Sequence, residues 1–278
     1  MPINAIIILF LPNIFSYLII PLYKVKQNII SILDPKEVIQ KLSRVEIYGE
    51  IEVGSERTKI KTFLTHVRTE LIISGKLIKN HKYDETLSKT YFCIYNKTKE
   101  FYYGMFSEII LSREDFFIKN NKNEFQHIEQ LKFILGTKSF SLEPYEGLLG
   151  LQLPYLNSEN DYNIINSLKN NKIIDSYDWF LDFNNMDKGE AKMYIGTLPH
   201  LINDKYESNN YDNYTNAAAS GNNMYWGMKF SEIYYGNEEN KLLKSYYSYI
   251  HFDFGLIFGP NELMEILDKQ FFNFTKYF

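Results

Sequence analysis

Cysteine is almost absent from this sequence, because Cys93 is the only one in 278 residues. An intramolecular disulfide is therefore excluded, and so is a zinc site built from several cysteines. Stability has to come from a hydrophobic core, and a composition that is 45% hydrophobic and 17% aromatic can supply one. Cys93 stands between Phe92 and Ile94 in an apolar run, which predicts a buried structural thiol.

The short motifs of several enzyme classes are also missing. The sequence contains no His-Glu-x-x-His, no Gly-x-Ser-x-Gly, no phosphate-binding loop and no dinucleotide glycine fingerprint. Positive charge is not in excess, since 30 Lys and Arg against 34 Asp and Glu give a net charge of -4. We therefore expect no metal, no cofactor and no nucleic-acid partner. The histidines outside residues 250–260 are scattered without the spacing of metal ligands: His66, His81, His127 and His200.

The N-terminal run of residues 3–21 is almost wholly apolar and is followed by the first charge at Lys24. Its length and composition suit a signal peptide or one membrane span. We therefore expect residues 1–26 to be a signal peptide or membrane anchor, residues 27–44 to be a linker, and the chain to be secreted or membrane-anchored through the secretory pathway. No small-residue cleavage site decides between removal and retention. A buried first strand or helix is the alternative.

Hydrophobic periodicity predicts a chain made mostly of strands. Apolar and polar residues alternate in residues 45–54, 59–73, 104–118 and 130–135, and the polar run 119–123 predicts a solvated loop. Residues 180–183 and 192–196 have the pattern of a hairpin. Short amphipathic helices are expected at residues 162–172 and 262–272. The sequence therefore predicts an all-β protein with few short helices.

Residues 250–260 resemble the second active-site loop of the pepsin-like aspartic peptidases, in which Asp-Thr-Gly-Thr-Ser leads through an apolar run to Gly-Pro. A gapless match that keeps Gly255 and Pro260 in register puts His251 where the family has its catalytic aspartate. A second register lays Asp253 on that aspartate but needs a deletion of two residues before the Gly-Pro. We prefer the gapless register, because a slip inside a tight loop would redirect every following side chain.

The sequence just before residue 74 resembles the end of the family's first active-site loop, Asp-Thr-Gly-Ser-Ser-x-Leu-Trp-Val. Counting back without gaps places Thr65, His66 and Val67 at the Asp-Thr-Gly positions. The nearest acidic residues, Glu56 and Glu70, fall outside the catalytic position. The resemblance thus implies that the first catalytic aspartate is absent. Val67 would also resist the left-handed backbone that glycine allows.

Other segments follow the order of the same family. Residues 82–91 resemble the stretch that precedes the flap hairpin, and residues 94–104 resemble the flap, with Tyr95 as the flap tyrosine and Tyr103 as the alternative. Residues 145–151 resemble the Phe-Asp-Gly-Ile-Leu-Gly-Leu signature, whose apolar pair and glycine thread beneath the active-site loop. Residues 225–233 resemble a strand of the second lobe. The substrate-cleft residues implied by the resemblance are Tyr95, Tyr103 and Gly255.

The resemblance spans about residues 45–272. It implies a bilobal pepsin-like fold with an N-terminal lobe at residues 45–158 and an incomplete C-terminal lobe at residues 159–278, which a protein partner could complete. Peptidases of this family need two carboxylates that share a proton. Without them we expect a non-catalytic pseudopeptidase that binds a peptide or protein. The alternatives are an active aspartic-type endopeptidase that uses His251 or Asp253, and a surface or structural protein that does not use the cleft.

Overall fold

The computed structural model describes residues 16–24, 47–65, 68–78, 81–98, 106–139, 146–152, 162–202, 227–234, 241–249 and 265. In these residues the regular structure is mostly β-strand with few short helices, which confirms the all-β prediction. The elements are β1 (Leu18–Lys24), β2 (Ile47–Val53), β3 (Thr58–Thr65), β4 (Leu71–Ser74), β5 (Phe92–Thr98), β6 (Phe106–Asn120), β7 (Phe125–Ser139), β8 (Gly147–Gly150), α2 (Ile164–Asn170), β9 (Trp179–Asp182), η1 (Met186–Lys188), β10 (Lys192–Ile195), α3 (Pro199–Ile202), β11 (Gly227–Tyr234) and β12 (Lys241–Tyr249).

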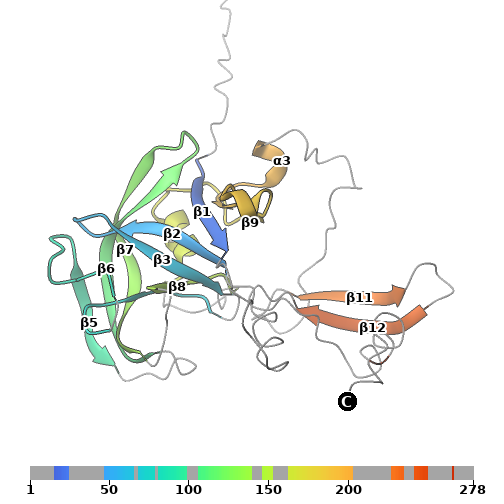
Figure 1. Cartoon of the computed structure of the whole chain (residues 1–278), viewed down its shortest axis with the longest axis horizontal. Helices are drawn as coiled ribbons and strands as arrows, with labels where there is room; N and C mark the ends of the chain where they lie inside the picture. Colours follow the sequence, from blue (N-terminus) through green and yellow to red (C-terminus); the bar gives the residue numbers. More distant parts are fainter. Residues whose placement is uncertain are drawn as a thin grey trace, which may run out of the picture.

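One strongly curved sheet contains ten of these strands, in the order β5-β6-β7-β4-β8-β3-β2-β1-β10-β9 (Figure 1). Further pairings of β6 with β1 and β2 fold the sheet back on itself, as a twisted sheet of this size tends to do. β11 and β12 form a separate antiparallel pair. The ten-stranded sheet includes β9 and β10, so it runs across the boundary predicted at residue 158.

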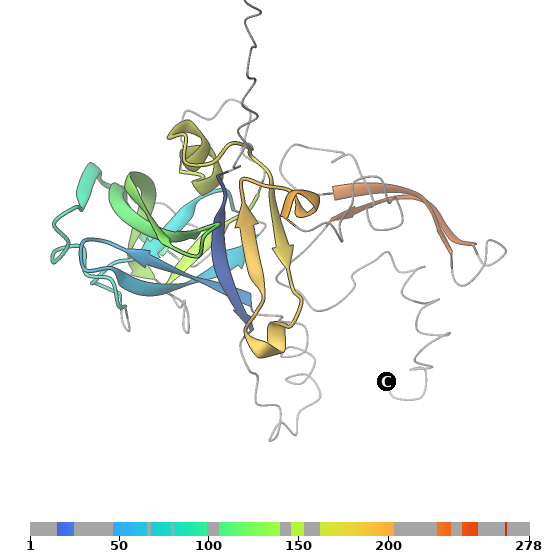
Figure 2. The ribbon, with the colours of Figure 1, turned by 90° about the horizontal axis from the view of Figure 1, so that it is seen from above.

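β1 lies inside the segment predicted as a signal peptide or anchor. It lies next to β10 and β2 and pairs with both (Figure 2). The side chains of Leu18, Ile20 and Leu22 are completely buried. The alternative of a buried first strand therefore describes residues 18–24. Residues 1–15 lie outside the described part of the chain, and their role as a signal or anchor stays a prediction. No helix in the described part of the chain is long and apolar enough to span a membrane.

The β6–β7 hairpin shows how the asparagine-rich run forms a turn. The side-chain oxygen of Asn120 accepts hydrogen bonds from the backbone N–H groups of Lys122 and Glu124. Asn123 has a φ of 62°, in the left-handed region that asparagine tolerates better than most residues. The predicted loop is thus confirmed as a tight turn between two long strands. Both strands are longer than the alternation of apolar and polar residues indicated. β6 continues to residue 120, and β7 already begins at residue 125.

The hydrophobic core lies between the curved layers of the sheet. Alternate residues of the central strands point into it, such as Ile60 and Leu64 of β3, together with Phe116 and Phe133, whose rings meet edge to face at 5.7 Å. Helix α2 closes one side with its apolar residues Ile164 and Leu168, which are both fully buried. Each such side chain contributes about 1.5–3 kcal/mol by leaving water. The helix and the β9–β10 hairpin confirm the predicted elements, although the helix is shorter than predicted.

Candidate functional site

The loop that carries Thr65 is built around an inserted strand. β3 and β4 are consecutive in sequence but do not pair, because β8 lies between them, parallel to β3 and antiparallel to β4. Thr65 is the partner of Gly150, and Leu148 is the partner of Ile72. Leu148 and Leu149 thus lie between β3 and β4.

Two glycines allow β8 to fit into this position. A Cβ atom at Gly147 would lie 2.6 Å from the carbonyl oxygen of Ile72. A Cβ atom at Gly150 would lie 2.7 Å from the carbonyl oxygens of both Arg68 and Glu70. Distances this short to backbone atoms cannot be relieved by a side-chain rotation. The spacing of the glycines in Gly-Leu-Leu-Gly is therefore required by the close approach of three strands.

The backbone of the loop is held in place by hydrogen bonds to its carbonyl groups. The carbonyl of Thr65 accepts from the N–H of Leu151 at 2.8 Å, and that of Arg68 accepts from the N–H of Gln152 at 2.7 Å. The side-chain amide of Asn163 donates to the carbonyl of Thr69 at 3.0 Å. Asn163 is also the N-cap of α2, so the helix anchors the loop. The described residues on both sides of positions 66 and 67 are therefore held in place by β8 and by helix α2.

Thr65 itself is buried at the end of β3 and is 3% exposed. Its neutral hydroxyl cannot act as the carboxylate base of an aspartic peptidase. Neither acidic neighbour in the sequence replaces it. The Glu70 carboxylate accepts a hydrogen bond from the N–H of Thr69 in the loop, and Glu56 lies in the turn that precedes β3, at the opposite end of that strand from Thr65.

Glu146 fixes the start of β8 and was not predicted from the sequence as a site residue. One oxygen of its buried carboxylate accepts a 2.5 Å hydrogen bond from the N–H of Lys61, and the other forms a 2.8 Å ion pair with Lys82. Its backbone bonds to Lys61 on β3 and to Ser74 on β4. An acidic residue directly before the glycine of the signature is the signal that could have identified it. Its role is to join β3 and β4 to the inserted strand.

Residues 94–98 of the predicted flap lie in β5, which pairs antiparallel with β6, and residues 99–104 lie outside the described part of the chain. Tyr95, the proposed flap tyrosine, is 61% exposed and lies on β5, which is an edge strand of the sheet. Phe92 and Ile94 are exposed on the same strand. The prediction of a buried Cys93 is wrong: the thiol is exposed, because β5 has a neighbour on one side only. An exposed aromatic strand next to a hairpin is available for contact with a ligand.

Four of the predicted site residues lie outside the described part of the chain. They are Tyr103 of the flap and the three positions of the second loop, His251, Asp253 and Gly255. Thr65 and Tyr95 are therefore the two predicted site residues whose surroundings the structure describes.

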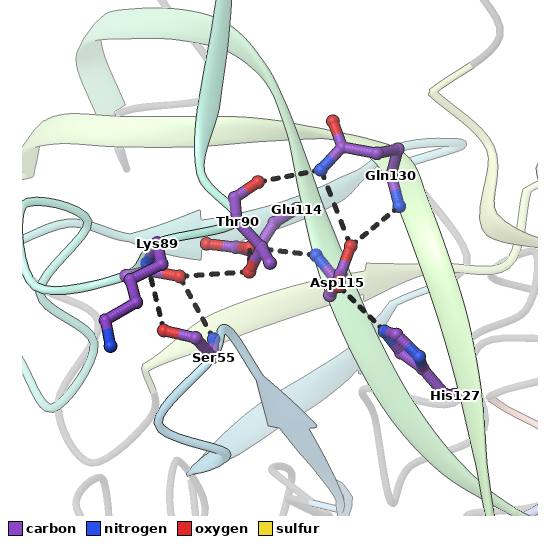
Figure 3. A network of polar contacts seen from close by, with 8 residues as sticks. Ser55, Lys89, Thr90, Glu114, Asp115, His127 and Gln130 are labelled. Atoms are coloured by element: carbon purple, nitrogen blue, oxygen red, sulfur yellow. Dashed lines mark hydrogen bonds and ion pairs between the residues drawn. The ribbon is translucent and has the colours of Figure 1, made fainter.

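A buried polar network lies where residues 81–91 cross β6, and no sequence motif indicated it (Figure 3). Glu114 is completely buried, and its carboxylate accepts hydrogen bonds from the hydroxyls of Tyr83 and Thr90 and from the N–H of Asp115. Burial, followed by the hydrogen bond to Glu114, raises the pKa of Tyr83 above its ordinary value of 10.0. The network thus ties the segment before the flap to the body of the sheet.

Asp115 continues this network towards the surface. One of its oxygens lies 2.7 Å from Nε2 of His127, and the other accepts a 3.0 Å hydrogen bond from the N–H of Gln130 (Figure 3). The ring of His127 stacks on Phe117 at a centroid distance of 4.8 Å. A histidine oriented by an aspartate resembles part of a catalytic triad, but no Ser, Thr or Cys among the described residues contacts His127. We interpret the pair as structural.

No protein-family model matches this sequence, and no curated protein matches it either. Function is therefore inferred from the chain's own residues. In the described part of the chain no three His, Cys, Asp or Glu side chains converge as metal ligands. At the end of β3, Thr65 presents a neutral hydroxyl, and the carbonyls of Thr65, Arg68 and Thr69 accept hydrogen bonds from within the chain. Activation of a water molecule at this position would require a carboxylate from elsewhere.

Proposed function

We propose that this chain is a pepsin-like peptidase homologue without the catalytic aspartate pair, which binds a peptide or protein and does not cleave it. The observation that carries the proposal is the path of β8. The segment that resembles the family signature is inserted between β3 and β4, beneath the loop where Thr65 stands in the place of the first aspartate. The same loop geometry would serve catalysis if a carboxylate were present.

The exposed strand β5 supports binding as the retained activity. Phe92, Ile94 and Tyr95 present a large apolar surface on an edge strand, with exposed fractions of 57%, 38% and 61%. Edge strands add extended peptides by backbone hydrogen bonds, while alternate side chains contact the peptide. Aromatic residues such as Tyr95 are common anchors at protein interfaces. The ligand that fits this surface is an extended, partly apolar peptide segment.

The test is a cleavage assay with the full-length chain and an unfolded protein as substrate, from about pH 3 to about pH 8. The folded chain should not cleave the substrate at any pH in this range, with or without a peptidic statine inhibitor. Thr69→Asp, in the same loop as Thr65, is the matched control for a Thr65→Asp, His251→Asp double variant. Inhibitor-sensitive cleavage by the wild type that Asp253→Asn or His251→Ala abolishes would overturn the proposal in favour of an active endopeptidase.

Binding is tested with the same statine peptide as the probe. We expect the wild type to bind it and Tyr95→Ala to weaken binding by about tenfold, since truncation of an aromatic anchor costs more than about 1 kcal/mol. The control is Tyr177→Ala, which removes a tyrosine of similar exposure. Tyr177 lies just before β9, and β9 is at the other end of the strand order from β5. Equal effects of the two variants, or no binding by a folded wild type, would contradict the assignment of β5 to the ligand.

A further inference from the structure

A pocket lies between the C-terminal end of α2 and the middle of the β6–β7 hairpin. Its volume is about 260 Å³, and its lining is polar. Arg113 of β6 and Lys132 of β7 contribute two cations to the lining, and Asn170 and Asn171 contribute amide groups from the helix end. The apolar core does not reach this pocket. A ligand held there would be hydrophilic.

The two cations are placed directly opposite each other. Arg113 and Lys132 are cross-strand partners in the β6–β7 register, a position where like charges destabilise a sheet. Among the described residues, neither has a carboxylate within ion-pair distance. Glu129 also lines the pocket, so the lining carries two positive charges and one negative. A pair of opposed cations with this excess charge is a site for an anion.

The backbone around the pocket is organised by the network at Asp115. Gln130, which lines the pocket, has a φ of 49°, an uncommon value for a residue other than glycine. It lies next to a register shift between Glu114 and Phe116, and its N–H is held by Asp115. Its side-chain amide donates to the carbonyl of Thr90 at 2.7 Å. A conformation that costs energy is thus maintained at the rim of the pocket.

The C-terminal end of α2 faces the pocket and repels an anion only weakly. The last carbonyl groups of a helix carry partial negative charge. Here the carbonyls of Ser167 and Lys169 accept hydrogen bonds from the N–H groups of Asn171 and Lys172. The buried carboxylate of Asp115 is likewise engaged by Gln130 and His127. The positive charges of the two strands therefore dominate the pocket.

We infer that this pocket binds the phosphoryl group of a small hydrophilic phosphomonoester. Arg113 can donate two parallel hydrogen bonds to phosphate oxygens, and Lys132 can supply a point charge from the neighbouring strand. The amide groups of Asn170 and Asn171 suit the hydroxyl groups of a sugar or polyol. The pocket is larger than a phosphate needs, which leaves room for that remainder of the ligand. The inference does not depend on the proposed peptide-binding function.

The test measures binding of inorganic phosphate, glucose 6-phosphate, glucose and acetate to the full-length chain by calorimetry at low ionic strength, where surface electrostatics are least screened. We expect glucose 6-phosphate to bind most tightly and phosphate next, with no heat from glucose or acetate. Arg113→Ala and Lys132→Ala should each weaken phosphate binding by at least about tenfold. Lys122→Ala, in the exposed β6–β7 turn, should leave binding unchanged, and Glu129→Gln should strengthen it.

A stability measurement separates a binding site from a mere charge cluster. Lys132→Gln removes the like-charge contact with Arg113, so in the absence of phosphate the variant should have a higher Tm than the wild type. Because the variant has also lost a phosphate-binding cation, added phosphate should raise its Tm by less than it raises the Tm of the wild type. Near-ultraviolet circular dichroism establishes that each variant is folded. The inference would be overturned if phosphate raised the Tm of the wild type and of Lys132→Gln equally. It would also be overturned if acetate bound as tightly as phosphate, or if Lys122→Ala weakened phosphate binding as much as Arg113→Ala.

Discussion

The hydroxyl of Tyr83 donates a 2.5 Å hydrogen bond to the buried carboxylate of Glu114. The tyrosine is 1% exposed and the glutamate is not exposed at all. Within the described residues Glu114 has no cationic partner, and three donors satisfy its oxygens: Tyr83, Thr90 and the N–H of Asp115. A buried carboxylate depends on such donors, because an unsatisfied one is costly. Glu114 therefore joins Tyr83 and Thr90 to β6 through one buried carboxylate.

The first prediction concerns the loss of this donor. Tyr83→Phe keeps the ring packed edge to face on Phe133 but removes the hydrogen bond to Glu114. We expect the free energy of unfolding to fall by about 1–3 kcal/mol, as for other buried groups that lose a partner. Urea denaturation followed by circular dichroism measures the change. Tyr177→Phe, at a tyrosine that is 56% exposed, is the control, and an equal loss in both variants would contradict the role of Glu114.

The second prediction is a loss of stability at high pH. Burial, and then the hydrogen bond to Glu114, raise the pKa of Tyr83 in the folded chain above its ordinary value. Its contribution is complete below about pH 10, where tyrosine is protonated in both states, and falls above it because the unfolded chain loses the proton first. The wild type should therefore lose about 1.4 kcal/mol per pH unit more than Tyr83→Phe above pH 10.

Urea denaturation of the wild type and Tyr83→Phe at several alkaline pH values checks this slope, with tyrosinate absorbance as a second signal. Parallel pH profiles for the two proteins would show that Tyr83 ionises as easily in the folded chain as in the unfolded chain. That result would refute the assigned shift in the pKa of Tyr83.

The elements that could be predicted from the sequence are those with a local signal. The asparagines after residue 119 marked a turn, because this signal comes from the side chains and the backbone freedom of those residues themselves. The β9–β10 hairpin likewise follows from local alternation. In each case the chain within a few residues contains the whole physical cause.

The features that could not be predicted depend on partners far along the chain. An unbroken apolar run has no period that would distinguish β1 from a signal peptide, and its partner β10 is more than 160 residues away. Cys93 is exposed because β5 is at an edge, which the strand order decides. The pairing of Tyr83 with Glu114 joins residues 31 positions apart, and an acid in a strand gives no sign that it will be buried.

The third prediction follows from the position of β1. Removal of residues 1–15 leaves β1 complete, so the shortened chain should fold with the circular dichroism spectrum of the full chain. Removal of residues 1–26 deletes β1 and leaves β2 and β10 without their common partner. It also removes three completely buried side chains worth about 1.5–3 kcal/mol each. We expect that chain to lack a cooperative thermal transition.

A pair of substitutions in β1 tests the same point without truncation. Ile20 is completely buried, whereas Ile19 on the opposite face is partly exposed. Ile20→Ala should lower the free energy of unfolding by about 2–5 kcal/mol, and Ile19→Ala by clearly less. If the chain without residues 1–26 kept the cooperative transition of the full chain, or if the two alanine variants were equally stable, β1 would not belong to the core.

The fourth prediction concerns the loop at Thr65. In Gly150→Ala the new methyl group would lie 2.7 Å from the carbonyl oxygens of Arg68 and Glu70, so β8 and the loop have to separate. The hydrogen bonds from Gly150 to Glu70 and from Gln152 to Arg68 should then weaken. We expect a loss of stability of about 1–3 kcal/mol, typical of overpacking, and faster amide exchange at Leu151 and Gln152.

Gly75→Ala is the matched control for this change. Its methyl group would also be crowded, at 3.0–3.2 Å, but the neighbouring atoms belong to the side chains of Glu85 and Leu135, which can move. We therefore expect a smaller loss of stability and unchanged exchange at Leu151 and Gln152. If Gly150→Ala were the milder variant, the backbone of the loop would have room to adapt. The close contact of β8 with Arg68 and Glu70 would then not hold this end of the loop, and its support for the proposed ligand site would be lost.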